Sequence, residues 1–126
     1  HFTTSIENSN NLCYCRSLNG KTIGYLIAML AEDTADILNI GIDTDFKRQG
    51  YGTSLINHLI EELRKRNISE ILLEVRAGNK SAIQFYKKQG FEKISVRKNY
   101  YTKNSKNQSH REDGIIMRIK ILSIKN

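Results

Sequence analysis

The sequence predicts an α/β or α+β fold, in which helices pack on a central sheet. Two observations carry this prediction. Short apolar segments rich in Ile, Leu and Val, typical of strands, lie before residue 43 and again at Glu70–Arg76. Between them, from Gly50, apolar residues recur every four positions, which is typical of an amphipathic helix. The chain has 126 residues, 39% of them hydrophobic, with neither a linker nor an internal repeat, so we expect one domain over residues 1–126.

A β-hairpin and a third strand are expected in the first third of the chain. The hairpin joins Leu12–Arg16 to Thr22–Ala31 through the turn Leu18–Lys21, whose Asn-Gly pair readily adopts positive φ. The third strand is Asp36–Ile42. Gly41 within it indicates either a β-bulge or a backbone that another group approaches closely.

The first helix should begin after Gly50 and fade at Asn67. Its apolar residues form one stripe, made of Leu55, Ile56, Leu59, Ile60 and Leu63. A second helix is bounded by Asn79, which is a favourable N-cap residue, and by Gly90, which suits a left-handed C-cap. Glu70–Arg76 is the strand between the helices. Two closing strands and the polar loop between them follow at Phe91–Arg97, Gly114–Ile121 and Tyr101–Asp113.

The net charge of +7 indicates an anionic partner, without distinguishing a nucleic acid from a phosphorylated small molecule. The basic residues are spread along the chain and are densest at Arg97–Arg111. Such a spread is more typical of a solvated surface, and basic motifs interleaved with aromatic residues are absent. We therefore expect no dedicated nucleic-acid site.

Cysteine content and hydropathy predict a cytoplasmic protein without a membrane partner. Cys13 and Cys15 lie two residues apart and cannot staple a fold, and no second Cys or His pair accompanies them at the spacing of a metal site. Packing in a reducing compartment is their expected role. The longest apolar run, Ile23–Ala31, is about half the length of a membrane span. The start of the chain also lacks the basic and apolar stretches of a signal peptide.

The segment between the third strand and the first helix is a candidate phosphate site. Two glycines two residues apart allow a tight turn whose N–H groups point to one spot, while the helix N-terminus and two cations add positive charge. The segment comprises Lys47, Arg48, Gln49, Gly50, Tyr51, Gly52 and Thr53. A glycine turn that merely begins a helix explains the same pattern equally well. The segment is neither a Walker A loop nor a complete dinucleotide fingerprint.

Three further residues are candidates for chemistry. Glu74 alternates with apolar residues in its strand, so a sheet position partly closed by helices would desolvate its carboxylate and favour general-base chemistry. A carboxylate at the rim of the sheet, paired with a nearby Arg, is the alternative. Tyr86 lies seven residues after Asn79, two helical turns along the same face, and is either a half-buried aromatic or a proton donor.

These residues belong to a longer pattern that resembles the GNAT N-acetyltransferases. After the Gly-x-Gly turn, the pattern continues with Leu73-Glu74-Val75-Arg76, Asn79, Ala82, Tyr86 and Gly90-Phe91. More narrowly, the chain resembles the ribosomal-protein-alanine N-acetyltransferase subfamily, which modifies a protein N-terminal amine. The narrower match rests on Leu38–Asp43, Leu73–Asn79, Arg97–Tyr101 and Glu112–Met117, and the resemblance extends nearly continuously over Gly20–Ile121.

The resemblance implies the GNAT fold, a mixed and mostly antiparallel sheet flanked by helices, and acetyl-CoA as co-substrate without a metal. Backbone groups of Ile40, Gly41 and Ile42 would pair with the pantetheine amides of the cofactor. Arg48–Thr53 would hold the pyrophosphate. Lys47 stands where the family usually has Gln or Arg, which keeps a phosphate role but loses bidentate geometry.

The resemblance also implies roles in acetyl transfer. Asn79 and Tyr86 would contact the cofactor, Glu74 would be the base that deprotonates the amine, and Tyr86 would be the acid that protonates the departing thiolate. The implied acceptor is a protein N-terminal peptide, on a ribosomal protein. A lysine or small-molecule amine as acceptor is one alternative, and a non-catalytic module that binds CoA or RNA is another. Intact Glu74 and Tyr86 argue against the second.

Two departures from the family pattern carry expectations of their own. The family begins with a strand and a helix upstream of the position of His1, so we expect the strand Leu12–Arg16 to present an uncovered edge. Such an edge predicts self-association or marginal stability. The polar loop Thr102–Arg111 is longer than the family pattern and leaves the acceptor side open.

Overall fold

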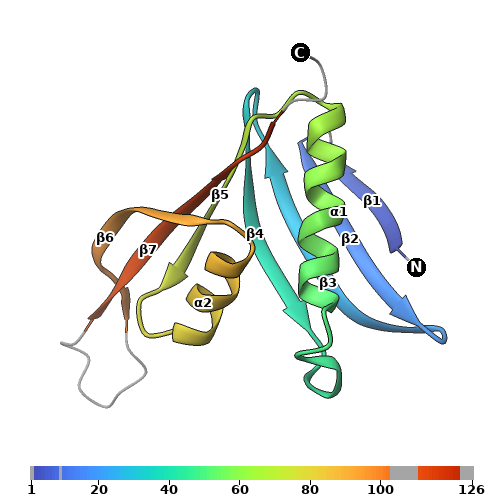
Figure 1. The fold of residues 1–126 in the computed structure, drawn as a ribbon, viewed down its shortest axis with the longest axis horizontal. Coiled ribbons are helices and arrows are strands. Elements are labelled where there is room, and N and C mark those ends of the chain that lie inside the picture. The colour runs from blue at the N-terminus through green and yellow to red at the C-terminus, as the bar shows by residue number, and fades with distance from the viewer. Residues whose placement is uncertain (1, 9, 103–110, 123–126) are drawn as a thin grey trace. The chain divides into compact units, whose positions relative to one another are not determined.

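The computed structural model describes residues 2–8, 10–102 and 111–122. The chain forms two compact units, which are described separately below. Unit 1 comprises His1–Ile71 together with Lys120–Asn126, and unit 2 comprises Leu72–Ile119. Figure 1 labels the strands and helices of both units.

Unit 1 contains four antiparallel strands in chain order, and all three predicted strands of this part are found. The strands are β1 (Phe2–Asn8), β2 (Asn11–Leu18), β3 (Lys21–Leu30) and β4 (Thr34–Ile42). The hairpin turn between β2 and β3 has φ of 51° at Asn19 and 80° at Gly20. Two successive positive φ values are those of a type I′ turn, as the Asn-Gly pair predicts.

The expected uncovered edge at Leu12–Arg16 is wrong. These residues lie in β2, which pairs with β3 on one side and with β1 on the other. The register with β1 sets Thr4 opposite Tyr14 and Phe2 opposite Arg16. Because the backbone groups on both sides of β2 have a strand beside them, self-association through this strand loses its physical basis.

A β-bulge interrupts β4, but it is not at Gly41. Ile27 of β3 lies opposite Asn39, and the next residue, Ala28, lies opposite Ile37, so Leu38 is the extra residue. Gly41 instead meets the second expectation, close approach of another group: a Cβ there would lie 2.6 Å from Cε1 of Tyr25. The tyrosine ring covers the backbone of Gly41, so any larger residue there would have to displace the ring.

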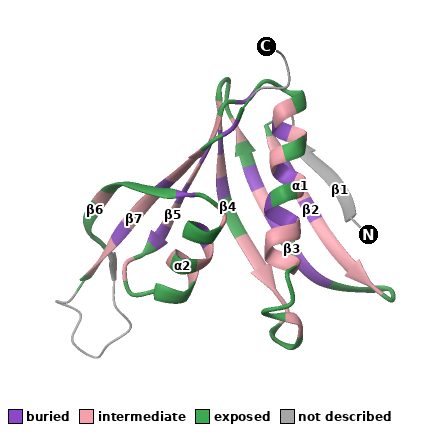
Figure 2. Ribbon diagram, viewed as in Figure 1, coloured by how far each residue is buried: buried purple, intermediate pink, exposed green. Residues whose placement is uncertain are grey.

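Helix α1 (Tyr51–Lys65) covers one face of this sheet, packing on β2, β3 and β4 (Figure 1). It follows a short 3₁₀ turn, η1 (Thr44–Phe46). The predicted apolar stripe is confirmed, since its fully buried residues are Leu55, Ile56, Leu59 and Leu63. Figure 2 shows the buried side of α1 facing the strands. The sheet contributes Leu12, Tyr14, Ile23, Leu26, Ala28, Ala35 and Ile37 to this core.

Tyr14 is a polar residue in this apolar core. Its side chain is 1% exposed, its ring lies edge-on to His58 at 4.6 Å, and its hydroxyl has no hydrogen-bond partner among the described residues. Burial, with a smaller contribution from the Glu62 carboxylate, raises the pKa of Tyr14 to about 12. The folded state therefore holds this proton more tightly than the unfolded chain does.

We expect Tyr14→Phe to reduce the alkaline sensitivity of the fold. In the wild type, the unfolded chain loses the Tyr14 proton from about pH 10 and the folded state only near pH 12. The free energy of unfolding should thus be intact below pH 10 and fall by about 2–3 kcal/mol between pH 10 and 12. Urea unfolding of both proteins across this range measures the difference. An equal fall in the free energy of unfolding of the wild type and the variant between pH 10 and 12 would contradict this prediction. At pH 7 the variant should be no less stable, because an unpaired buried hydroxyl is removed.

Unit 2 contains the second helix, α2 (Lys80–Lys88), and the remaining strands. The strands are β5 (Glu70–Arg76), whose first two residues belong to unit 1, β6 (Glu92–Thr102) and β7 (Arg111–Lys120). Their order is β5-β7-β6, and β6 pairs with β7 in antiparallel register. The predicted second helix, the strand before it and the two closing strands are confirmed.

The loop between the closing strands is shorter than its predicted bounds, Tyr101–Asp113. Strand β6 continues to Thr102 and β7 starts at Arg111, and of the polar segment Thr102–Arg111 residues 103–110 lie outside the described part. An irregularity between Arg97 and Tyr101 lets the pairing continue. There Asn99 has a φ of 53°, and its backbone N–H donates to Oδ1 of Asp113 at 2.9 Å. Asp113 thus satisfies a backbone donor within the irregularity, and pairing resumes at Tyr101 and Thr102.

The predicted class of fold, with helices on a mostly antiparallel sheet, is confirmed. Neither α1 nor α2, the two α-helices of the described residues, is long and apolar enough to cross a membrane.

Candidate functional site

The candidate phosphate segment lies between η1 and α1, and its backbone turns sharply twice. Arg48 has a φ of 63° and Gly50 a φ of 87°, so two left-handed residues stand close together before the helix. Gly50 is the N-cap of α1 and contributes no side-chain cap. Since the first turn of an α-helix has N–H groups without intrahelical acceptors, the segment presents backbone donors and the positive helix end together. Lys47 and Arg48, both exposed, add cationic charge there.

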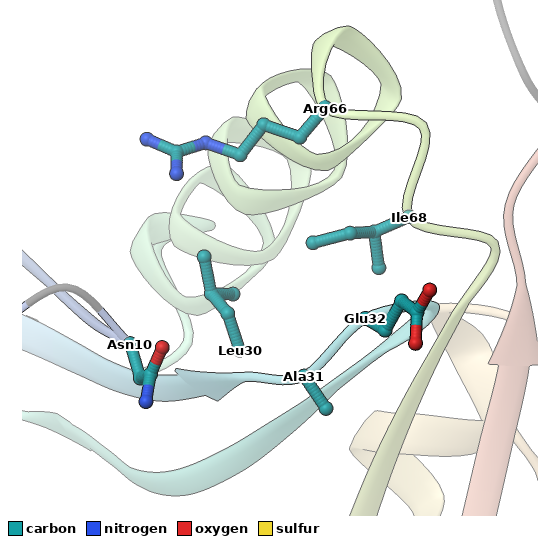
Figure 3. A pocket seen from close by; sticks show the side chains of 6 residues that line it. All are labelled: Asn10, Leu30, Ala31, Glu32, Arg66 and Ile68. Carbon is teal, nitrogen blue, oxygen red and sulfur yellow. The ribbon is translucent and has the colours of Figure 1, made fainter.

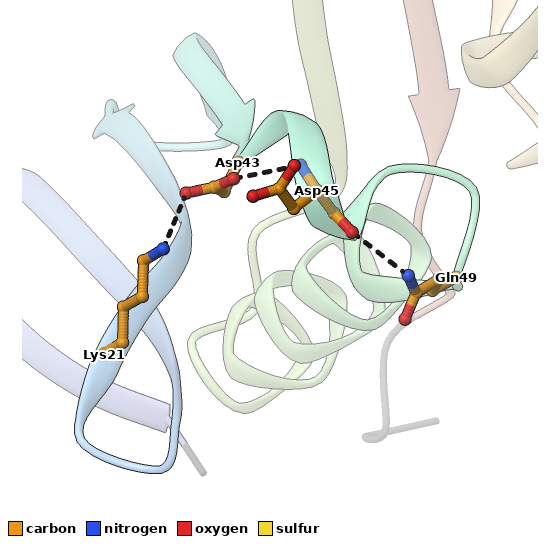
Figure 4. A network of polar contacts seen from close by, with 4 residues as sticks. All are labelled: Lys21, Asp43, Asp45 and Gln49. Atoms are coloured by element: carbon orange, nitrogen blue, oxygen red, sulfur yellow. Dashed lines mark hydrogen bonds and ion pairs between the residues drawn. The ribbon is translucent and has the colours of Figure 1, made fainter.

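A chain of polar contacts fixes the start of this segment (Figure 4). Lys21 Nζ lies 3.5 Å from Oδ2 of Asp43, whose Oδ1 accepts the backbone N–H of Asp45 at 3.0 Å. The side-chain amide of Gln49 donates to the backbone oxygen of Asp45 at 3.3 Å. The hydrogen bond from Asp45, together with the Lys21 ammonium, lowers the pKa of Asp43. Gln49 is thus engaged in holding the loop.

The predicted pantetheine-binding residues lie at the end of β4. Gly41 and Ile42 line a pocket of about 350 Å³ whose other walls are Thr22, Ile23, Gly24, Tyr25 and Asp43. Ile40 pairs with Leu26 of β3, and the hydroxyl of Tyr25 donates to Oδ1 of Asn39 at 3.1 Å. Because alternate backbone groups of a strand point to opposite sides, those of Ile40–Ile42 that do not bond to β3 are the ones a ligand amide would meet.

A larger hollow of about 590 Å³ lies at the opposite end of α1 (Figure 3). It contains none of the predicted site residues. Its walls are Asn10, Leu30, Ala31, Glu32, Arg66 and Ile68. Arg66 is held by Glu62, with Nε 2.9 Å from Oε2.

The proposed base, Glu74, is in the middle of β5 in unit 2. Oε1 lies 3.3 Å from a guanidinium nitrogen of Arg97, whose guanidinium also stacks on the Tyr100 ring at 4.4 Å. Oε2 is buried and has no hydrogen-bond partner among the described residues. The Arg pairing of the alternative interpretation is therefore present. Arg97 engages Oε1 of Glu74 and leaves Oε2 available to another donor.

Asn79 and Tyr86 lie at the two ends of α2. Asn79 is the N-cap, and its side-chain oxygen accepts the N–H of Ala82 at 3.3 Å, as predicted. The cap uses the oxygen, so a ligand would meet the amide nitrogen, which is a donor. Tyr86 is buried between the rings of Phe85 and Phe91, at 5.3 and 5.7 Å. Burial raises the pKa of Tyr86, so its hydroxyl, which is protonated at neutral pH in any tyrosine, stays protonated further into the alkaline range.

Glu112, at the start of β7, has a role that no sequence pattern predicted. Its Oε2 accepts the backbone N–H of Gly78 at 2.9 Å, and its Oε1 lies 3.5 Å from Arg76. A Cβ at Gly78 would collide with the same carboxylate. Glu112 thus fixes the turn that joins β5 to the N-cap of α2. The pattern Glu112–Met117 contributed to the family resemblance, but no local spacing indicates a contact across 34 residues.

We expect Glu112→Ala to destabilise this turn by about 1–3 kcal/mol, since the N–H of Gly78 loses its acceptor. Glu112→Gln keeps an acceptor oxygen and should restore most of the loss. Denaturant unfolding of the two variants measures the difference. An equal loss in the free energy of unfolding of both variants would show that the charge of Glu112 next to Arg76, and not its hydrogen bond to Gly78, stabilises the turn.

The two units divide the predicted site residues between them. Unit 1 contains Ile40, Gly41 and Ile42 and the segment Lys47–Thr53, and unit 2 contains Glu74, Asn79 and Tyr86. Within residues 2–8, 10–102 and 111–122, no group of three or more His, Cys, Asp or Glu side chains is placed to hold a metal ion.

Comparison with known proteins gives a consistent result. The model of the acetyltransferase (GNAT) family matches residues 1–91. The ribosomal protein bS18-alanine N-acetyltransferase of Escherichia coli K12 is 43% identical over 103 residues, covering 82% of this chain and 67% of that protein. The crystal structure of the ribosomal-protein-S18-alanine N-acetyltransferase from Escherichia coli has a TM-score of 0.84 and 38% identity, covering 95% of this chain and 74% of that one. An acetyltransferase from Bacillus anthracis in complex with acetyl coenzyme A has a TM-score of 0.82 and 25% identity, covering 92% and 65%.

Proposed function

The chain belongs to the GNAT acetyltransferase family, and from this premise we propose that it transfers the acetyl group of acetyl-CoA to the N-terminal α-amine of a protein. We infer further that the acceptor is the N-terminal alanine of a ribosomal protein. The observation that carries both steps is the 43% identity, over most of the chain, to an enzyme named for that reaction. Acetyl-CoA is bound in a solved structure of similar fold, which supports it as the acetyl donor.

The residues of unit 1 suit the binding of the cofactor. The turn with two left-handed residues, the first turn of α1 and the cations Lys47 and Arg48 form a binding place for the pyrophosphate. The backbone of Ile40–Ile42 would extend the sheet through the pantetheine amides. Asn79 of unit 2 would donate to the cofactor through its amide nitrogen.

The residues of unit 2 suit proton transfer. The neutral amine attacks the thioester carbonyl, a C–N bond forms, and the C–S bond breaks to release the CoA thiolate. Glu74 would accept the proton of the incoming ammonium at Oε2, which has no partner of its own among the described residues. Tyr86, whose hydroxyl is protonated at neutral pH, would donate its proton to the thiolate. Arg97 would hold the carboxylate of Glu74 in place.

Mass spectrometry of acceptor peptides tests this proposal. The purified chain is incubated with acetyl-CoA and a peptide that begins with alanine and contains an internal lysine. A matched peptide with a blocked N-terminus is the control. Acetylation of the free N-terminus alone is the expected result. Acetylation of the lysine in both peptides would show that the acceptor is a lysine amine and not the N-terminal α-amine. Binding of acetyl-CoA without acetylation of any amine would overturn the proposal that the chain is an enzyme.

A further inference from the structure

The charge of the chain is concentrated in one of its two units. Unit 2 contains 11 of the 20 Lys and Arg residues but only 4 of the 13 Asp and Glu residues. The whole net charge of +7 therefore lies in residues 72–119, and the rest of the chain is neutral. The basic residues are densest at Arg97–Arg111, and the division into units places that segment and the whole positive surplus in unit 2.

Three of the four acidic residues of unit 2 are used inside it. Glu74 pairs with Arg97, Glu112 with Arg76 and the N–H of Gly78, and Asp113 accepts the N–H of Asn99. The fourth, Glu92, is exposed and has no such contact among the residues that the structure describes. The potential around unit 2 is positive because its 11 basic residues outnumber its 4 acidic ones. Arg76 and Arg97 are each paired with a carboxylate, so the other basic residues carry the surplus.

The solvent face of α2 presents this charge on a rigid element. Its exposed residues are Lys80, Ser81, Gln84, Lys87 and Lys88, which the helical repeat places on one side. The other side contains the buried Tyr86. The face thus carries three cations and two neutral hydrogen-bonding groups, and no acid. Its two cationic ends are separated by about 10–12 Å along the axis.

Stabilisation of the helix does not account for this pattern. Lys87 and Lys88 lie in the last turn, where cations favour the helix dipole. Lys80, however, is the first helical residue, where a cation is unfavourable, and the first turn contains no acidic residue. A helix selected for stability alone would have the opposite charge at that end.

We propose that the lysine face of α2, defined by Lys80, Ser81, Gln84, Lys87 and Lys88, is a docking surface for the phosphate backbone of RNA. Duplex nucleic acid carries about one negative charge per 1.7 Å of its axis, so several phosphates lie within the length of this face. The face exposes no aromatic side chain on which a base could stack, and the binding is therefore independent of sequence. The choice of RNA among polyanions rests on the proposed function, because a ribosomal-protein acceptor is assembled with RNA. Docking would bring the enzyme to its acceptor and leave the chemistry on free peptides unchanged.

The experiment compares two matched double variants. Lys87→Gln with Lys88→Gln removes two cations from the lysine face. Lys65→Gln with Lys120→Gln removes two exposed cations from unit 1, one of them also in the last turn of a helix. Binding to a 20-base-pair RNA duplex of arbitrary sequence is measured by fluorescence anisotropy at several salt concentrations. Lys87→Arg with Lys88→Arg keeps the charge and should bind as the wild type does.

We expect the α2 variant to lose about tenfold in affinity near 0.1 M salt and the slope of log K against log salt to fall by about 2. The unit 1 control should keep both, and all variants should acetylate a short peptide at the wild-type rate. Equal losses in the two Gln variants, or wild-type binding by the α2 variant, would overturn the proposal. So would binding to anionic vesicles without binding to RNA. RNA binding that depends on the lysine face, without acetylation of any peptide, would support the docking surface but contradict the proposed function.

Discussion

Glu74→Gln should lower the turnover number by about 10²–10⁴-fold, which is the usual contribution of a general base. The amide keeps the size of the carboxylate but cannot accept the amine proton. A protein α-amine has a pKa near 8, so at higher pH the solvent supplies the neutral amine and part of the lost rate should return. Affinity for acetyl-CoA should stay close to that of the wild type.

Tyr86→Phe is the counterpart at the other end of the proton transfer. It keeps the ring packed against Phe85 and Phe91 but removes the proton donor. Turnover should fall, and raising the pH should not restore it, because neutral amine does not replace a proton donor to the thiolate. The wild type should keep this donor protonated into the alkaline range, since burial raises the pKa of Tyr86.

Rate profiles of the two variants from neutral to alkaline pH, on an alanine-first peptide, separate these roles. Circular dichroism and thermal melts serve as the control for folding, because Glu74→Gln also removes the partner of Arg97. Wild-type rates in both variants across the range would remove both residues from the mechanism.

Gly50→Val should weaken acetyl-CoA binding by about tenfold or more. Gly50 has a φ of 87°, and a β-branched residue there would force the turn before α1 out of shape. A side chain at this position meets no atom of the protein within 4 Å, so crowding inside the protein does not contribute. Lost donors to the pyrophosphate are each worth about 1.5–3 kcal/mol.

Gly50→Asn is the matched control, since Asn tolerates positive φ better than other residues. If the turn shape alone matters, Asn should bind acetyl-CoA nearly as well as Gly. If the phosphate also lies close against the backbone, Asn should remain impaired. Isothermal calorimetry measures both. Normal affinity in a folded Gly50→Val would remove this segment from the cofactor site.

Much of the fold follows from local signals. The apolar stripe of α1, the Asn-Gly turn and the cap residue Asn79 each depend on neighbours a few positions away, and each is where the pattern placed it. Strand β1 was missed because Phe2–Asn8 consists mainly of Ser, Thr and other polar residues, and only its pairing with β2 makes it a strand. The bulge at Leu38 is also a property of two strands in register, which a single strand does not reveal.

The site shows the same division. The left-handed Gly50 before α1 and the position of Glu74 in a strand follow from sequence, because glycine placement and alternation are local. The second predicted turn glycine, Gly52, lies inside α1, and Arg48 is the other left-handed residue instead. The contacts that hold these residues do not follow from sequence. Arg97 reaches Glu74 from another strand, and Glu112 reaches the N–H of Gly78 across 34 residues. Such partners are fixed by the fold, so a carboxylate or guanidinium alone gives no sign of them.

The contact between Glu112 and Gly78 has a consequence during synthesis of the chain. The N–H of Gly78 leaves the ribosome 34 residues before its acceptor, which at about 5–20 residues per second is a delay of about 2–7 s. Strand β6 also lacks its partner during this time, because it pairs with β7, which is synthesised only after the polar segment between them. Throughout that interval the turn before α2 and one strand edge are open to other chains. The nascent protein therefore exposes this turn and this strand edge while residues 92–120 are being made. A chaperone that binds at that stage would protect it, whereas slow codons there would prolong the exposure.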